Sequence, residues 1–317
     1  MNGKNVLVTG GAGFIGSHLV DRLIKENPAR LCVIDNLFLG KLRNLDDAKK
    51  DFDLKIYKKD ATNSKVLKKI IKKNEIDIVF DLAAVPLPTS FERPRFCFEN
   101  NLNIAFNLIE LMREGLLKDL VHYSTSESYG SLQYAPMDEK HPLLPRNVYG
   151  ASKAAIDHLL MSYAMVFDIK MSIIRPFNNF GPRQNEDAYA GVIPITIRRI
   201  LDGKNPILYG DGKQTRDYIF VKDTAEATVR ITKEEKTRGK VINVAMGKEI
   251  KIGYLIGKIV ELMDFRGDVI KEPERKSDVR RHFASNSVLK ELTGYTPKTS
   301  FENGLKETIE WYKQNLK

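Results

Sequence analysis

The feature that most constrains the fold of this chain is a glycine-rich turn close to its first residues. A short apolar run is followed by Gly10, Gly13 and Gly16 in a G-x-x-G-x-x-G pattern, and Phe14 and Ile15 open an amphipathic helical pattern. Glycines at this spacing allow a tight strand-to-helix turn and a close approach of the backbone to a ligand. The helix N-terminus then faces the phosphates of a dinucleotide. We expect all five residues to contact such a cofactor.

The second apolar run indicates which dinucleotide is bound. Leu31-Cys32-Val33-Ile34 is typical of a strand and ends in Asp35, and we expect Asp35 and the next residue, Asn36, to contact the cofactor. A carboxylate at this place accepts hydrogen bonds from ribose hydroxyls and repels a 2′-phosphate. Arg43 follows soon after, and its positive charge would favour the 2′-phosphate of NADP. The balance favours NAD over NADP.

Strands and helices alternate through the first half of the sequence. We expect strands near 5–9, 31–35, 54–59, 76–82, 119–124 and 169–175. This alternation predicts an α/β fold with a doubly wound (Rossmann) parallel sheet and with ligands at the carboxyl ends of the strands. The alternation breaks after Pro176. We therefore expect a second, smaller unit to begin there.

A separate pattern of phenol, ammonium, hydroxyl and carboxyl groups indicates the chemistry. Tyr149 and Lys153 are four residues apart, which places them on one face of a predicted helix. A lysine beside a phenol favours the phenolate, so the tyrosine can exchange a proton with a hydroxyl near neutral pH. A hydroxyl from Ser124-Thr125-Ser126 would share that proton, and Glu127 adds a carboxylate. The pattern predicts redox chemistry at a hydroxyl carbon followed by an acid–base step.

These residues are similar to those of a known enzyme family. With further motifs, they resemble the extended short-chain dehydrogenases/reductases that modify nucleotide sugars, namely 4-epimerases, 4,6-dehydratases and glucuronate decarboxylases. The further motifs are Asp60-Ala61-Thr62, Asp81-Leu82-Ala83-Ala84, Asn101, Arg175-Pro176-Phe177-Asn178-Asn179-Phe180-Gly181-Pro182, Gly210-Asp211-Gly212 and Arg216-Asp217. The resemblance implies additional NAD contacts from Asp60, Ala61, Leu82, Ala83, Ala84, Asn101, Ser124, Tyr149, Lys153 and Pro176.

The same resemblance implies how the chain is divided. An NAD-binding domain of residues 1–176 plus about 217–248 is interleaved with a smaller mixed α/β substrate-binding lobe of residues 177–216 and 249–317.

The resemblance also implies where a UDP-, dTDP- or GDP-sugar would bind. Thr89 and Ser90 fall where the family touches the hexose, and Asn178 falls where it contacts phosphate or ribose. The stretch 184–194 resembles the loop that closes over the nucleotide base. Within it we expect Val192 to contact the substrate and Tyr189 to be a candidate for stacking on the base.

Arginines are the candidates for the substrate diphosphate. A guanidinium group is a rigid fork that can bind phosphate oxygens with two hydrogen bonds. Arg216 follows Gln214-Thr215, and Arg275 and Arg280 frame a late segment similar to the family's phosphate-binding one. We expect all three side chains to face the diphosphate.

Composition and helix patterns indicate the partners. The family pairs the helices that correspond to 101–113 and 149–166 in a homodimer, and their apolar stripes otherwise lack a partner.

The net charge is +10, but the lysine clusters lack the interleaved aromatic residues of a surface that binds single-stranded nucleic acid, so no nucleic-acid partner is expected. No apolar run reaches the ~18–20 residues of a membrane helix. Cys32 and Cys97 predict neither a disulfide nor a metal site, and the expected compartment is the reducing cytoplasm.

Glu127 distinguishes the reactions that the resemblance allows, all of which begin with oxidation at the sugar C4. A 4,6-dehydratase needs a base for the C5 proton, which Glu127 suits, so dehydration is the first expectation. Most such enzymes have Asp-Glu where this chain has Ser126-Glu127. A 4-epimerase needs no extra carboxylate, and the loop 189–194 resembles epimerases of N-acetylated sugars. Glucuronate decarboxylation and a non-catalytic NAD-binding sensor are further alternatives, although sensors usually lose the Tyr149 or Lys153 counterpart.

Overall fold

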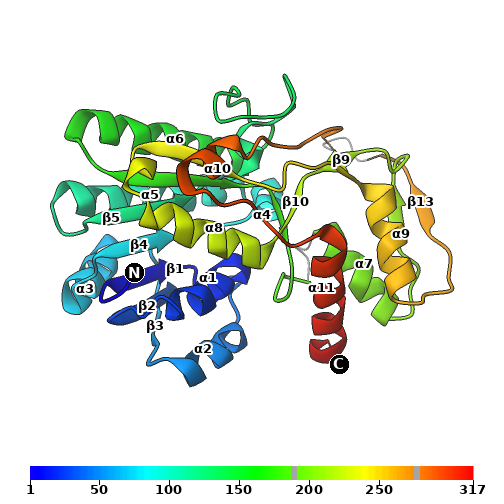
Figure 1. The fold of residues 1–317 in the computed structure, drawn as a ribbon, viewed down its shortest axis with the longest axis horizontal. Coiled ribbons are helices and arrows are strands. Elements are labelled where there is room, and N and C mark those ends of the chain that lie inside the picture. The colour runs from blue at the N-terminus through cyan, green and yellow to red at the C-terminus, as the bar shows by residue number, and fades with distance from the viewer. Residues whose placement is uncertain (187–190, 275–278, 317) are drawn as a thin grey trace.

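The computed structural model describes residues 1–186, 191–274 and 279–316. In this part of the chain, seven strands form one parallel sheet in the order β11-β6-β5-β4-β1-β2-β3 (Figure 1). The strands are β1 Asn5–Thr9, β2 Arg30–Asp35, β3 Lys55–Lys58, β4 Ile78–Asp81, β5 Asp119–Tyr123, β6 Met171–Pro176 and β11 Lys240–Val244. The Val-, Ile- and Leu-rich runs of the inner strands are buried on both faces, as parallel strands require, whereas the edge strand β3 is partly exposed. The predicted doubly wound sheet is confirmed.

Helices cover both faces of this main sheet (Figure 1). Alternate strand residues divide between two hydrophobic cores: Val6 and Val8 pack into one, and Leu7 into the other. The first core is closed by α1 Phe14–Ile24, α2 Asp46–Asp51, α8 Val221–Lys233 and α10 Ser287–Thr293. The second is closed by α3 Ser64–Asn74, α5 Pro94–Arg113 and α6 Val148–Phe167. The short helix α4 Leu87–Glu92 packs against α5 and α6.

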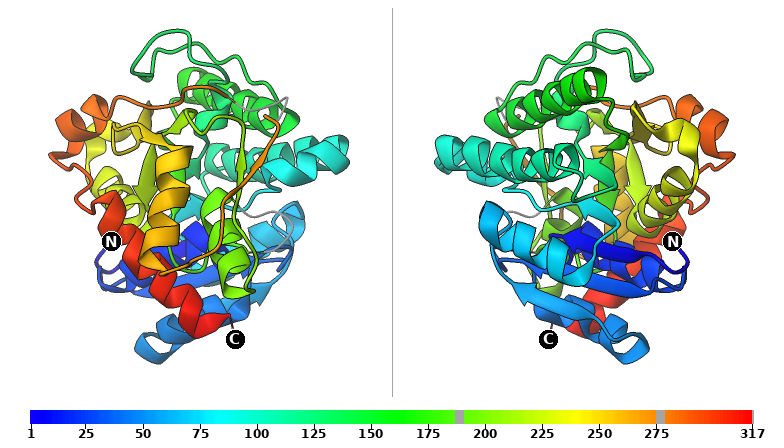
Figure 2. Two further views of the ribbon diagram at one scale, coloured as in Figure 1. Left: turned by 90° about the vertical axis from the view of Figure 1, so that its right-hand side faces the viewer. Right: turned by 90° about the vertical axis from the view of Figure 1, so that its left-hand side faces the viewer.

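A third core belongs to a smaller lobe, which lies on the right of Figure 1 and faces the viewer in the left panel of Figure 2. We call it the second lobe. Its helices are α7 Val192–Leu201, α9 Ile252–Leu262 and α11 Phe301–Asn315. Its short strands are β7 Asn178–Phe180, β8 Ile207–Tyr209, β9 Thr215–Arg216, β10 Tyr218–Phe220, β12 Ile250–Lys251 and β13 Ile270–Glu272. They form the pairs β10-β7, β12-β9 and β13-β8, of which β12-β9 is antiparallel.

The chain crosses between the two lobes more often than the sequence indicates. The expected boundary at 249 assigns α10 to the second lobe, whereas Leu289, Leu292 and Tyr295 pack into the core beneath the main sheet. The Tyr295 hydroxyl donates to the Asp223 carboxylate at 2.9 Å, which fixes this return against α8. Amphipathicity alone does not tell which core a seven-residue helix covers.

Candidate active site

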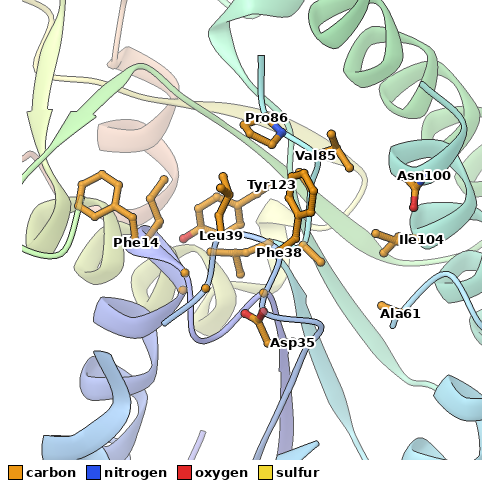
Figure 3. A pocket seen from close by; sticks show the side chains of 18 of the residues that line it. Phe14, Asp35, Phe38, Leu39, Ala61, Val85, Pro86, Asn100, Ile104 and Tyr123 are labelled. Carbon is orange, nitrogen blue, oxygen red and sulfur yellow. The ribbon is translucent and has the colours of Figure 1, made fainter. Parts of the chain in front are cut away.

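A cavity of about 410 Å³ opens at the carboxyl ends of the central strands (Figure 3). Among the predicted cofactor residues, those that line it are Gly10, Gly13, Phe14, Ile15, Gly16, Asp35, Asn36, Asp60, Ala61, Leu82, Ala83, Ala84, Ser124, Tyr149, Lys153 and Pro176. Thr125, predicted to be catalytic, lines it as well. Residues from six of the seven sheet strands or from the loops just after them thus converge on one space, as expected at the topological switch point of such a sheet.

The glycine turn is packed too closely for any other side chain. Gly10 has φ +65°, and a Cβ on it would lie 2.8 Å from the Ala83 backbone nitrogen. A Cβ on Gly16 would lie 2.2 Å from the Gly10 carbonyl oxygen. The turn and the segment after β4 therefore form one continuous backbone wall of the cavity. Such a wall at a helix N-terminus suits a pyrophosphate.

Asp35 makes the adjacent wall anionic. Its carboxylate accepts hydrogen bonds from the backbone nitrogens of Ala12, at 3.0 Å, and Leu37, at 2.8 Å. Burial raises the pKa of Asp35, and these two donors oppose that rise. Arg43, the cation that argued for NADP, reaches away to Glu186 at 3.3 Å. The described residues that line this part of the cavity therefore present a carboxylate to the ribose site. This charge would repel the 2′-phosphate of NADP, so the cavity fits NAD.

Two further predicted cofactor residues shape the wall differently. Asp60 accepts hydrogen bonds from Asn36 Nδ2 at 3.1 Å and from the Thr62 backbone at 2.8 Å. Asn101 is buried behind the wall, and its Oδ1 accepts from the Val85 backbone nitrogen at 2.7 Å. Asn101 thus fixes a residue that lines the cavity, and its direct contact with NAD stays a prediction.

Tyr149 and Lys153 point into the cavity from α6. Burial raises the pKa of the Tyr149 phenol, and a hydrogen bond with the Thr125 side chain lowers it in part. The Lys153 ammonium donates to the Tyr123 carbonyl oxygen at 2.6 Å. Lys153 is not among the groups that shift the pKa of Tyr149, so its expected stabilisation of the phenolate stays a prediction.

Buried carboxylates accompany Lys153. Burial lowers the pKa of its ammonium, and the charges of Asp81 and Asp157 oppose this. Asp157 in turn accepts from Ser124 Oγ at 2.8 Å and from Arg175 Nε at 2.9 Å. The predicted cofactor residue Ser124 is therefore oriented by an ion pair behind the cavity.

Ser126 and Glu127 lie beside the cavity formed by the described residues and do not line it. Both belong to a 3₁₀ turn, Ser126–Ser128, that packs against the start of α6. Glu127 Oε2 accepts from Asn147 Nδ2 at 2.9 Å, and Asn147 Oδ1 caps α6 at the Gly150 nitrogen at 2.7 Å. The Glu127 charge also raises the pKa of Tyr149, so the carboxylate is electrically close to the phenol.

The predicted substrate residues that the structure describes lie outside the lining of this cavity. Thr89 and Ser90 are buried in α4, and Thr89 Oγ1 has no hydrogen-bond partner among the described residues. Asn178 Nδ2 donates to the Asp217 carbonyl at 3.3 Å, and Val192 begins α7. Their contacts with a substrate stay predictions.

The predicted arginines are engaged within the protein. Arg216 donates to the Val279 carbonyl, and Arg280 makes a bidentate pair with Asp211 at 2.9 and 2.6 Å. A diphosphate would have to compete with Asp211 for Arg280. Arg275 and Tyr189 lie outside the described residues.

Sequence reasoning missed much of the cavity lining. The unexpected residues include aromatic and amide side chains and a cation: Phe38, Lys59, Phe96, Asn100, Phe177, Asn179 and Gln184. Phe177 and Asn179 stand within the Arg175–Pro182 motif, so that motif was the available signal. The others come from loops and helices whose approach to the cavity depends on tertiary packing. Among the described residues, no group of three or more His, Cys, Asp or Glu could hold a metal ion, and no helix is long and apolar enough to cross a membrane.

Proteins of known family and structure are similar to this chain over nearly its whole length. Residues 7–308 match the sequence model of the family described as GDP-mannose 4,6 dehydratase. The chain is 33% identical to a putative UDP-glucose 4-epimerase of Methanocaldococcus jannaschii, over 98% of this chain and 99% of that protein. A UDP-N-acetylglucosamine 4-epimerase of Methanobrevibacter ruminantium, solved with UDP-N-acetylmuramic acid, is 37% identical with a TM-score of 0.92 and 99% coverage of each chain. A dTDP-glucose 4,6-dehydratase of Bacillus anthracis, solved with NAD, is 29% identical with a TM-score of 0.88, and 98% of this chain and 97% of that one are covered.

Proposed function

This chain belongs to the GDP-mannose 4,6-dehydratase family of extended short-chain dehydrogenases/reductases, and on that premise we propose that it is a UDP-sugar 4-epimerase. It is an NAD-dependent enzyme that modifies a nucleotide sugar. The proposed substrate is a UDP-hexose or UDP-N-acetylhexosamine, because the two epimerases compared above are named for UDP-glucose and UDP-N-acetylglucosamine.

The residues of the cavity divide the work of binding from that of proton transfer. The turn of Gly10, Gly13 and Gly16 would hold the pyrophosphate of NAD, and Asp35 would hold a ribose. When bound there, NAD would supply hydride transfer to and from the sugar C4. The charges of Asp81 and Asp157 favour the charged form of Lys153 beside this part of the cavity, against the effect of burial.

Tyr149 is the group that moves the proton. It takes the proton of the C4 hydroxyl as the C4–H bond breaks, and the Thr125 side chain shares that proton through its hydrogen bond. The product of this half-reaction is a 4-keto sugar. Return of hydride to the opposite face, with the proton given back by Tyr149, inverts C4 and leaves the mass unchanged.

One observation favours epimerisation over dehydration, which was the first expectation from the sequence. The segment 124–127 offers hydroxyl groups to the cavity, while its carboxylate, Glu127, is held by Asn147 beside the cavity. Ser126 also lacks a carboxyl group that could protonate a leaving hydroxyl. The second candidate, 4,6-dehydration, is favoured by the effect of the Glu127 charge on Tyr149, which puts a base near the reacting sugar.

Product analysis over a panel of UDP-, dTDP- and GDP-sugars in heavy water tests the proposal. An epimerase gives a product of unchanged mass with C4 inverted and no deuterium at C5. A product lighter by one water and labelled at C5 would replace the proposal by 4,6-dehydration, and loss of carbon dioxide from a glucuronate would replace it by decarboxylation.

Glu127→Gln separates the two leading reactions within one protein. The amide keeps the shape and can still bond to Asn147, but it cannot take a proton. We expect an epimerase to keep its turnover within about threefold, whereas a dehydratase should lose on the order of 10² or more.

The proposal also covers the cellular compartment and the oligomeric state. We place the enzyme in the cytoplasm, since Cys32 and Cys97 are both buried free thiols. We also propose a homodimer through the outer faces of α5 and α6.

A further inference from the structure

A carboxylate from the segment 181–186 reaches the loop that closes the cofactor cavity. The Glu186 side chain is 7% exposed. Its Oε1 lies 2.7 Å from Lys41 Nζ and 3.3 Å from Arg43 Nη2. The pair joins positions 145 residues apart in sequence, so it ties together two segments that the chain itself does not hold together.

Lys41 ends a loop that forms one wall of the cavity. Phe38 and Leu39 of this loop stand above Asp35 in Figure 3, and they line the cavity with Asn36 and Gly40. The Lys41 backbone nitrogen donates to the Ala12 carbonyl oxygen in the glycine turn at 3.0 Å. The loop 36–41 thus covers the site on one side and is fastened to the glycine turn at its end.

The segment that carries Glu186 is itself firmly held. Arg183 donates to Asp21 on α1 at 2.7 Å. The Tyr312 hydroxyl of α11 donates to the Gln184 carbonyl oxygen. Anchored at both α1 and α11, this segment can restrain the loop rather than move with it.

We propose that Glu186 is a positioning residue that clamps the loop 36–41 from the segment 181–186 and so slows the release of NAD. A dinucleotide bound beneath Phe38 and Leu39 leaves when this loop shifts, and the clamp opposes the shift. The clamp also lowers the entropy that the loop loses on binding. The ion pair is less screened than a surface pair because the carboxylate is nearly buried.

The inference rests on the proposed NAD-dependent function but is tested by binding rather than by turnover. NAD affinity is measured by calorimetry on cofactor-free protein, and NAD release by displacement in a stopped-flow instrument. Glu186→Gln should weaken binding about threefold to tenfold, mostly through faster release. Lys41→Met should have a smaller effect, because Arg43 still pairs with Glu186. The Glu186→Gln effect should shrink in the Lys41→Met background, and Lys41→Arg should stay near the unmutated protein.

Glu307→Gln is the matched control. It removes the same charge from another ion pair, with Lys222 at 2.6 Å, which joins α8 to α11 away from the cavity. This variant should bind and release NAD as the unmutated protein does. Equal NAD release from Glu186→Gln and Glu307→Gln, with all proteins folded by circular dichroism, would overturn the clamp and leave the proposed function standing. If the unmutated protein binds no NAD, both the proposed function and the clamp fail.

Discussion

At the scale of single residues, the site depends on how buried charges are balanced. Lys153 is 2% exposed and is accompanied by the carboxylates Asp81 and Asp157. Asp157 is balanced in turn by Arg175, which also stacks over the Tyr129 ring at 4.8 Å. An isolated buried charge costs several kcal/mol, whereas a paired and hydrogen-bonded one is tolerated. The carboxylates of this network therefore oppose the burial that lowers the pKa of the Lys153 ammonium.

Tyr149→Phe tests the proton-transfer role. Removing the phenol hydroxyl should lower turnover by on the order of 10²–10⁴, the range for a general acid–base group. Tyr163→Phe, on the same helix, is the control, because its hydroxyl bonds to Glu110 at 2.7 Å and not to the cavity. Turnover of the proposed UDP-sugar is followed by mass spectrometry and NMR. Comparable activity in the two variants would show that the chemistry lies elsewhere.

Asp217 gives a pH dependence of stability. It is fully buried, and burial raises the pKa of its carboxyl to about 7 despite hydrogen bonds from backbone nitrogens such as those of Met246 and Gly247. Since the pKa is higher in the folded protein than in the unfolded one, Asp217 stabilises most below about pH 4, and this contribution is lost as the pH rises to about 7.

The measurement compares the free energy of unfolding of the unmutated protein and of Asp217→Asn in urea at pH 5 and pH 8. The unmutated protein should lose stability relative to the variant by up to about 3 kcal/mol across this range. A difference that stays constant with pH would contradict the raised pKa.

At the scale of elements, the fit between α6 and the turn Ser126–Ser128 fixes the position of Tyr149, the proposed catalytic residue. A Cβ on Gly150 would lie 2.6 Å from the Glu127 carbonyl oxygen, so Gly150 lets the first turn of α6 approach that backbone. Gly150→Ala should lower the free energy of unfolding by about 1–3 kcal/mol and displace Tyr149. Gly257→Ala in α9, where a Cβ meets no atom of the described residues within 4 Å, should be neutral or stabilising by up to about 1 kcal/mol. The free energy of unfolding of both variants is measured in urea. Equal changes in the two variants would argue against close packing at Gly150.

The same scale shows what the sequence could predict. Six of the seven strands of the main sheet were predicted, most of them as apolar runs between turn residues. The seventh, β11, was not among the expected strands, although its residues were assigned to the NAD-binding domain. The strands of the second lobe have two or three residues, too few for a period of two to show. α5 begins at Pro94 rather than near 101, since proline suits the first helical turn.

The candidate site was predictable to a similar degree and for a related reason. The glycine turn, Asp35 and Tyr149 were predicted from short sequence motifs, because the residues next to them in sequence are also next to them in space. The wall formed by Phe38 and Phe96 depends on loops that meet only in the folded chain. Helical spacing likewise does not reveal burial, which raises the pKa of Tyr149.

At the scale of the whole molecule, the outer face of the α5–α6 pair is the proposed dimer surface. The two helices pack side by side, as the right panel of Figure 2 shows, and leave Phe106, Met165, Val166 and Phe167 exposed. We expect light scattering to give twice the chain mass, and Val166→Glu to give the mass of one chain. Leu201→Glu, an equal change at an exposed site on α7, should leave the dimer intact. A monomeric unmutated protein at micromolar concentration would refute the dimer.

The return of α10 to the main core has a consequence for how such a protein can diversify. Because the chain passes from α9 in the second lobe to α10 beneath the main sheet, and back to α11, no single break separates one lobe from the other. A recombination event that replaced everything after residue 249 would also replace part of the cofactor domain's own core. An exchange of the second lobe between two such proteins would therefore need breaks on both sides of α10.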